Sequence, residues 1–207
     1  MKSFRHVGFS LVEILVVLSI IAIGLTLSLP SWNDARSKRE LINASEHLSM
    51  FLSAGRSLAL KHNRDVAVSL VYRDHTDWCV GMVDTGLACD CTVEDAGRND
   101  YCSVGGVPQI LYANDLSGAV LISHAADSLF VFDRIRGTLI PADLSQPHFF
   151  NLMSTNRIMG LQVGVSITGN TFICNWVKSA SAPAYRSCES VFGEPDTPAH
   201  EGNLHIN

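Results

Sequence analysis

An almost uninterrupted apolar run near the start of the chain constrains its fold more than any other feature. The run, FSLVEILVVLSIIAIGLTLSL, extends from Phe9 to Leu29 and contains one ionisable side chain, Glu13. At about 1.5 Å per residue, a helix of this length reaches roughly 31 Å, the thickness of the hydrocarbon core of a bilayer. The run therefore predicts a membrane-spanning helix.

The residues around the run argue against a secretory signal peptide. Lys2 and Arg5 precede the run, but no A-x-A cleavage signal of small residues follows it, and it stops at Pro30. A plain single-span anchor is the simplest alternative. It leaves Glu13 unexplained, because a carboxylate near the bilayer centre costs about 2.5 to 3.5 kcal/mol and requires a partner or a function.

Gly8, Phe9 and Glu13, set in GFSLVEILVVLSIIAIG, resemble the processing site of type IV prepilins and pseudopilins. The resemblance implies that a prepilin peptidase cuts after Gly8 and methylates Phe9, and that Glu13 becomes the fifth residue of the mature chain. Pro30 stands where the family commonly has a helix-kinking proline. In an apolar bundle of helices, the new amine of Phe9 is a natural partner for Glu13 of a neighbouring subunit.

The chain after Pro30 changes from helical to β-rich patterning. Spacings of three and four predict an amphipathic helix from Trp32 to about Lys61 that Asn63 and Arg64 end, and its apolar face comprises Leu41, Ser45, Leu48, Leu52, Gly55 and Ala59 or Leu58. Strands are predicted at Val66–Tyr72, Trp78–Val83, Gln109–Ala113, Ala119–Ser123, Leu129–Phe132, Thr138–Ile140, Phe149–Leu152, Leu161–Ile167 and Thr171–Trp176. Gly169-Asn170 predicts a two-residue hairpin turn between the last two strands.

Looser motifs in these strands extend the resemblance over most of the chain. Trp78, Phe132, Gly137 and the Thr168-Gly169 pair stand in an order similar to that of the GspH/FimT (FimT/FimU-like) family of minor pilins and pseudopilins. The family implies an α+β, pilin-like fold, in which a long N-terminal helix with a transmembrane half and an amphipathic half packs on antiparallel β-sheets.

The resemblance also implies an organisation and a location. We expect a leader at 1–8, a transmembrane and assembly helix at 9–30, the amphipathic half of that helix at 31–62, a periplasmic β-rich domain at 63–180 and an irregular tail at 181–207. The protein would be a single-pass inner-membrane protein with its C-terminal domain in the periplasm, and would be incorporated in a pilus or pseudopilus.

The implied function is that of a minor pilin in the complex that primes or caps a pilus. Its partners would be prepilin peptidase, other minor pilins, the major pilin and the inner membrane. A minor pseudopilin of a type II secretion system, GspH-like, is the alternative. A second alternative, a DNA-binding competence pilin, is disfavoured because 20 acidic side chains outnumber 15 basic ones and the family's G-R-x-R element is absent from Gly169-Asn170-Thr171-Phe172.

Six cysteines indicate disulfides in an oxidising periplasm. Cys174 lies in the last predicted strand, Cys188 follows it 14 residues later, and the two are the first expected pair. The partners among Cys79, Cys89, Cys91 and Cys102 stay open. Zinc binding by these four cysteines and calcium binding by the acidic loop from Asp84 to Asp100 are alternatives, but the spacings match neither kind of site. No nucleophile elbow or paired histidines are present, so we expect no enzyme, cofactor or small-molecule substrate.

Overall fold

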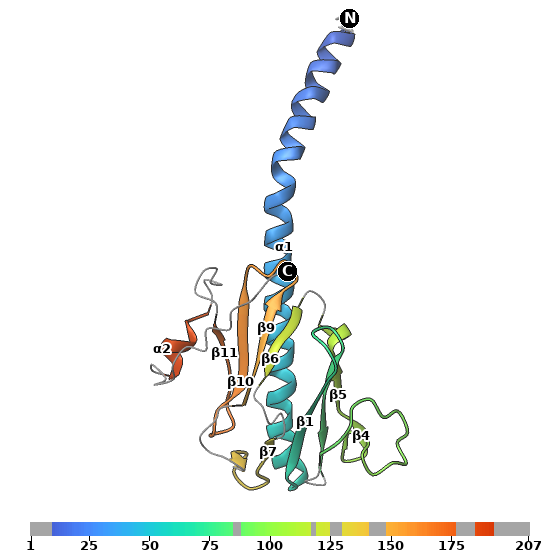
Figure 1. The fold of residues 1–207 in the computed structure, drawn as a ribbon, viewed down its shortest axis with the longest axis vertical. Helices are drawn as coiled ribbons and strands as arrows, with labels where there is room; N and C mark the ends of the chain where they lie inside the picture. The colour runs from blue at the N-terminus through green and yellow to red at the C-terminus, as the bar shows by residue number, and fades with distance from the viewer. Residues whose placement is uncertain are drawn as a thin grey trace, which may run out of the picture.

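A single long helix is the organising element of the protein. The computed structural model describes residues 10–84, 88–116, 119–124, 130–140, 148–176 and 185–192. Helix α1 is continuous from Leu11 to His62, and its C-terminal half packs on antiparallel sheets while its N-terminal half projects from them (Figure 1). The predicted α+β fold, a long N-terminal helix on antiparallel sheets, is confirmed.

The C-terminal end of α1 follows from its sequence. Asn63 caps the helix in the left-handed conformation, at φ 52°, and its backbone N–H donates to the carbonyl oxygen of Ala59. Asparagine tolerates this conformation better than most residues, and the contact satisfies one of the helix's terminal carbonyls. The predicted apolar face is also confirmed, since its members Leu41, Ser45, Leu48, Leu52 and Ala59 are fully buried.

One antiparallel sheet has five strands in the order β5-β2-β1-β7-β8. Its strands are β1 (Val66–Tyr72), β2 (Trp78–Val83), β5 (Ile110–Tyr112), β7 (Phe130–Phe132) and β8 (Leu139–Ile140). A short ribbon of β3 (Ser103–Val104) and β4 (Val107–Pro108) lies before β5, and the 3₁₀ helix η1 (Ala113–Asp115) follows it.

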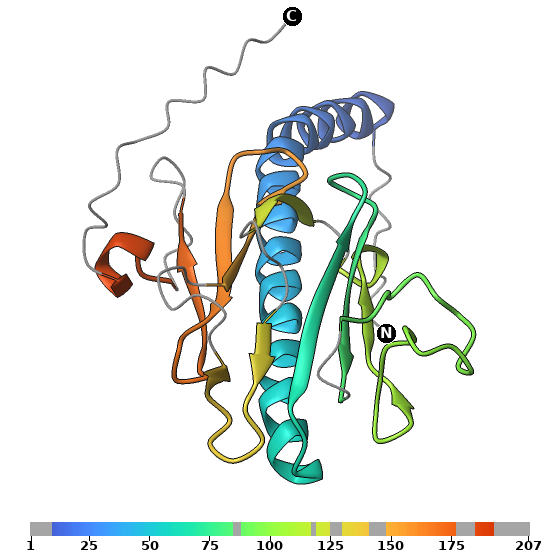
Figure 2. The same ribbon diagram turned by 60° about the horizontal axis from the view of Figure 1, so that its bottom comes forward.

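The other main sheet has four strands in the order β11-β10-β9-β6. Its strands are β6 (Ala119–His124), β9 (His148–Ser154), β10 (Gly160–Val165) and β11 (Thr171–Asn175), and the short helix α2 (Cys188–Phe192) follows it. Helix α1 runs along the junction of the two sheets, with the four-stranded sheet on one side and the five-stranded sheet on the other (Figure 2).

The core lies between α1 and the sheets. Alternate residues of β2 face opposite ways: Val80 and Met82 pack in the main core with Leu48 and Leu52 of α1, whereas Cys79 packs in a second cluster with the disulfide-bonded cysteines. All six residues of β2 are buried, because α1 covers one face of the strand and the loop of residues 88–102 covers the other.

The predicted strands are all present among the described residues, with ends shifted by two residues or fewer. Two details of the element list differ. β3 and β4, too short to show a period, were not predicted. The tail predicted as irregular contains α2 and a bridge between Asn175 and Ser187.

The predicted two-residue turn between β10 and β11 is wrong, although the hairpin itself is present. The Gly169 N–H donates to the Ser166 carbonyl and the Ser166 N–H donates to the Asn170 carbonyl, so the loop comprises three residues, 167–169. Of these three residues, Gly169 alone has a positive φ, 79°. A type I turn closed by a left-handed glycine matches the strand twist better than Gly-Asn at the turn centre.

Candidate functional site

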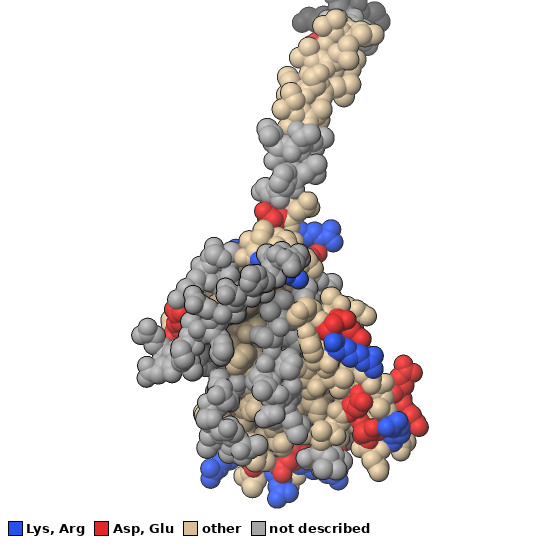
Figure 3. Space-filling view, viewed as in Figure 1, with Lys and Arg blue, Asp and Glu red and all other residues tan. Residues whose placement is uncertain are grey.

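The N-terminal part of α1 is an uncovered apolar surface. Every large apolar side chain described from Leu11 to Ile23 is between 49% and 76% exposed, the set being Leu11, Val12, Ile14, Leu15, Val16, Val17, Leu18, Ile20, Ile21 and Ile23. In Figure 3 this part of the helix carries no charged side chain except an acidic one near its N-terminal end. A soluble monomer rarely exposes a continuous apolar patch of this extent, so the surface indicates an interaction site.

Glu13 lies in the first turn of α1 and is exposed. The partial positive charge of a helix N-terminus favours a carboxylate there. No basic side chain of the described residues forms an ion pair with Glu13. Ser19, the other polar side chain of this stretch, donates to the Leu15 carbonyl within the helix, which leaves Glu13 as the group that can bind an external cation.

The other residues singled out near the N-terminus are the cleavage pair Gly8 and Phe9 and the predicted helix-kinking Pro30. Gly8 and Phe9 lie outside the described residues. Pro30 lies inside the continuous α1, whose N-terminal half leans away from the axis of the packed half (Figure 1); a kink caused by Pro30 stays a prediction. Within the described part of the chain, no helix has both the length and the hydropathy to cross a membrane.

The six cysteines form three disulfides: Cys174–Cys188, Cys79–Cys91 and Cys89–Cys102. The first is the pair that the sequence favours, and the other two resolve the pairing that the sequence left open. Gly81 makes the Cys89–Cys102 bridge possible, because a Cβ atom at position 81 would collide with Cys102 Sγ. The missing side chain lets the Cys89–Cys102 bridge lie directly on the sheet.

These disulfides bear on the zinc alternative. All four sulfurs that would ligate zinc are bonded to one another in pairs, so they are not thiolates that can bind a metal. The acidic loop has its own local bonding: Asp90 Oδ1 accepts from the N–H and hydroxyl of Thr92, and Asp100 pairs with Arg98 at 2.6 Å. The Thr92 hydrogen bonds lower the pKa of Asp90.

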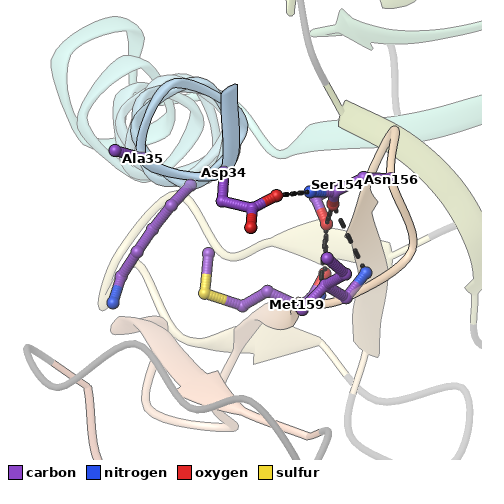
Figure 4. A pocket seen from close by; sticks show the side chains of 7 residues that line it. Asp34, Ala35, Ser154, Asn156 and Met159 are labelled. Carbon is purple, nitrogen blue, oxygen red and sulfur yellow. Dashed lines mark hydrogen bonds between the residues drawn. The ribbon is translucent and has the colours of Figure 1, made fainter. Parts of the chain in front are cut away.

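A second feature, which the sequence did not predict, lies where α1 leaves the sheets. The turn between β9 and β10 reaches α1, and Asn156 Nδ2 donates to Asp34 Oδ1 at 3.3 Å. Figure 4 shows the two side chains in contact where they line a cavity of about 250 Å³. The other lining residues are Ala35, Lys38, Ser154, Ile158 and Met159. Sequence periodicity carries no signal for this contact, because its partners are 122 residues apart.

Comparisons with known proteins find similarity in structure alone. No protein-family model matches the chain, and no curated protein sequence matches it. Two crystal structures of the type IV minor pilin FimU from Pseudomonas aeruginosa are similar, with 16% identity and TM-scores of 0.44 and 0.42. Each similarity covers 70% of this chain and 95% or 98% of the FimU chain.

Proposed function

We propose that the protein is a minor type IV pilin that prepilin peptidase cleaves after Gly8 and that enters the complex priming or capping a pilus. The observation that carries this proposal is the exposed apolar half of α1 with Glu13 in its first turn. This helix begins at Leu11, two residues after the Gly8-Phe9 pair. The role is one of assembly, and the partners are other minor pilins and the major pilin.

The physical argument starts from the uncovered apolar surface. Burying apolar area stabilises by about 25 cal/mol per Å², so a helix exposed on all sides gains most where lipid or other helices surround it. The run from Phe9 to Leu29 would be surrounded by lipid before assembly and by neighbouring helices in a filament. We call the packed part of the chain, the C-terminal half of α1 with both main sheets and α2, the head domain. Its three disulfides suit the oxidising periplasm.

Glu13 gives the surface its specificity. A carboxylate surrounded by apolar helices is strongly destabilising without a cation, and truncating one partner of a buried pair typically costs about 3 to 5 kcal/mol. Cleavage after Gly8 would supply that cation as the amine of Phe9 on an adjacent subunit. Cleavage would then be coupled to assembly, since an uncleaved chain has no amine at that position.

Mass spectrometry of the mature protein tests the proposed cleavage after Gly8. We expect a chain that begins at Phe9 and carries one methyl group on its amine. A mature chain that still begins at Met1 would contradict the proposal.

Glu13→Leu tests whether Glu13 pairs with the Phe9 amine of a neighbouring subunit during assembly, and Glu94→Leu is the matched control. Glu13→Leu should still fractionate with membranes but be depleted from sheared filaments by tenfold or more, because the amine of its neighbour loses its partner. Glu94 is an exposed carboxylate of the 88–102 loop, and its replacement should leave incorporation unchanged. Equal incorporation of both variants would exclude this role for Glu13.

Deletion of the gene distinguishes a role in a type IV pilus from a role in the pseudopilus of a type II secretion system. Loss of surface pili with type II secretion intact is expected. Loss of secretion with normal pili would assign the protein to a pseudopilus.

A further inference from the structure

A group of cations and exposed apolar side chains lies on α1 and on the adjacent β9–β10 turn, immediately after the apolar half of the helix. We call it the collar, and it comprises Trp32, Arg36, Lys38 and Arg39 of α1 with Arg157 and Ile158 of the β9–β10 turn. The Asn156–Asp34 hydrogen bond fixes the turn against the helix. The collar therefore combines residues that are far apart in the sequence on one end of the head domain.

The position of the collar along α1 is given by helix geometry. Asp34, where the turn touches α1, is five residues beyond Leu29, which corresponds to about 7.5 Å along the axis. The headgroup layer on each side of a bilayer is about 5 to 8 Å thick, from a core of about 30 Å and a total of about 40 to 45 Å. If Phe9 to Leu29 spans the core, Trp32 and Asp34 lie at the headgroups. Lys38 begins about 13.5 Å beyond Leu29, and its long side chain, directed toward the N-terminal end of α1, reaches back to the outer edge of that layer.

The exposed side chains of the collar match that layer. Trp32 is 71% exposed and Ile158 is 50% exposed, and tryptophan is enriched at membrane interfaces because its ring is apolar with one polar edge. Lys38, Arg39 and Arg157 form no ion pair with any described residue, whereas Arg36 pairs with Glu40 at 2.7 Å. The four cations of the collar outnumber the two carboxylates beside it, Asp34 and Glu40, so this end of the molecule is positively charged.

We propose that the collar binds anionic phospholipid headgroups at the periplasmic surface of the membrane and holds the head domain against the bilayer before assembly. This inference rests on the proposed function, since it requires the apolar half of α1 to be in the membrane. Lys38 and Arg157 approach the headgroup phosphate from α1 and from the turn. The cavity beside Lys38, lined partly by Ile158 and Met159, accommodates the glycerol part of the lipid.

The lipid is selected by charge. A cation close to an anionic leaflet contributes about 1 kcal/mol, or about fivefold in affinity, and a zwitterionic leaflet provides no comparable attraction. A nucleic acid is a poorer occupant of the collar, because the membrane-embedded helix places this end of the head domain against the bilayer. The collar thereby also explains a cluster of Arg36, Lys38 and Arg39 on the periplasmic side, where the positive-inside rule does not expect it.

The test uses the full chain in nanodiscs of phosphatidylcholine alone or with phosphatidylglycerol. Hydrogen exchange of the Arg157, Ile158 and Met159 amides is measured, since each donates a hydrogen bond within the turn. Exchange should be at least fivefold slower in the anionic discs, and about 0.5 M salt should abolish the difference.

Charge reversal identifies the residues responsible. Lys38→Glu combined with Arg157→Glu should abolish the lipid dependence, whereas Arg134→Glu combined with Arg136→Glu should preserve it, because that exposed turn follows β7 at the opposite end of the head domain. Equal exchange in both kinds of disc, or an unchanged difference in the Lys38/Arg157 variant, would overturn the collar inference.

A separate measurement distinguishes failure of the collar from failure of the proposed function. Alkaline carbonate extraction reports whether the chain is inserted in the nanodisc lipids at all. A chain that resists extraction but shows no lipid-dependent exchange refutes the collar alone. A chain that is extracted from both lipids refutes insertion through α1, and with it the collar.

Discussion

Gly169 shows how one residue joins two loops of the head domain. It has a φ of 79° in the β10–β11 turn, and a Cβ atom there would collide with the Gly137 carbonyl oxygen of the β7–β8 turn. Arg56 joins the β10–β11 turn to α1, since its Nη1 donates a hydrogen bond to Asn170 Oδ1 at 2.6 Å. The glycine therefore serves both the backbone conformation and the close approach of the two turns.

A matched pair of substitutions separates these two roles. Gly106 has a similar φ of 77°, but no atom lies within 4 Å of the Cβ position. Gly106→Ala should destabilise by about 1 kcal/mol, the cost of the left-handed conformation alone. Gly169→Ala should cost about 1 to 3 kcal/mol more, because the two turns must move apart. Urea denaturation measures both, and equal losses would contradict the packing role.

Tyr185 links the segment before α2 to α1. Its hydroxyl donates to Glu46 Oε1 at 2.7 Å. Burial, and after it the hydrogen bond and charge of Glu46, raises the pKa of Tyr185 from 10.0 to about 12. Because the folded protein binds this proton more tightly than the unfolded chain, the stabilisation is complete below about pH 10 and is lost as the pH rises toward 12.

Glu46→Gln tests this link at high pH. The glutamine keeps a hydrogen-bond acceptor but removes the negative charge, so the pKa of Tyr185 should fall toward 10 while burial holds it above that value. Ultraviolet titration of tyrosinate, with Tyr185→Phe to assign the signal, measures the change. Glu40→Gln is the control, since Glu40 pairs with Arg36 and should leave the titration unaltered.

At the scale of elements, disulfides hold in place segments that have little regular structure or are too short to be stable alone. The loop of residues 88–102 has little regular structure, yet Cys79–Cys91 and Cys89–Cys102 hold it on the outer face of β1 and β2. Helix α2 has five residues, and Cys174–Cys188 joins it to β11. An isolated helix of this length is not stable in water, so the crosslink is what retains it.

Removing Cys174–Cys188 should therefore release α2. The double variant Cys174→Ser with Cys188→Ser should be about 3 kcal/mol less stable, by the chain-entropy model for a loop of this size, and the amides of residues 187–192 should lose protection. Denaturation and hydrogen exchange measure the two effects. Unchanged protection of α2 would mean that the Asn175–Ser187 bridge suffices to hold it.

At the scale of the whole molecule, the two halves of α1 have separate roles. The fully buried core residues of the helix begin at Leu41, and the apolar residues up to Ile23 are exposed. The head domain is thus complete without the projecting half. The projecting half, in turn, has no covering within this chain among the described residues.

A truncated chain of residues 32–207 tests this separation. It retains every α1 residue of the core, so its thermal midpoint should lie within about 2 °C of that of the full chain in detergent, given that 1 kcal/mol shifts such a domain by about 2 to 4 °C. It should also remain monodisperse without detergent, whereas the full chain should aggregate. Sedimentation checks this, and a large loss of stability would show that the projecting half supports the fold.

The sequence was sufficient for features that depend on local patterns. Spacings of three and four located the buried face of α1 from Leu41 to Ala59, and Asn63 marked its end, because helix periodicity and capping act over a few residues. The strand positions followed from short β-rich runs between turn residues. The motif Gly8, Phe9 and Glu13 indicated the proposed function without reference to any other part of the chain.

Only the tertiary structure decided the features that join distant segments. The pairing of Cys79 with Cys91 and of Cys89 with Cys102, the five-residue α2, the three-residue turn at Gly169 and the contact of Asn156 with Asp34 were all beyond the sequence patterns. Sequence alone determined that an apolar helix precedes an amphipathic one. The packing of the two sheets determined which strands lie against that helix, mainly β9, β10 and β11 of one sheet and β1 of the other, because burial depends on what the rest of the chain brings against each face.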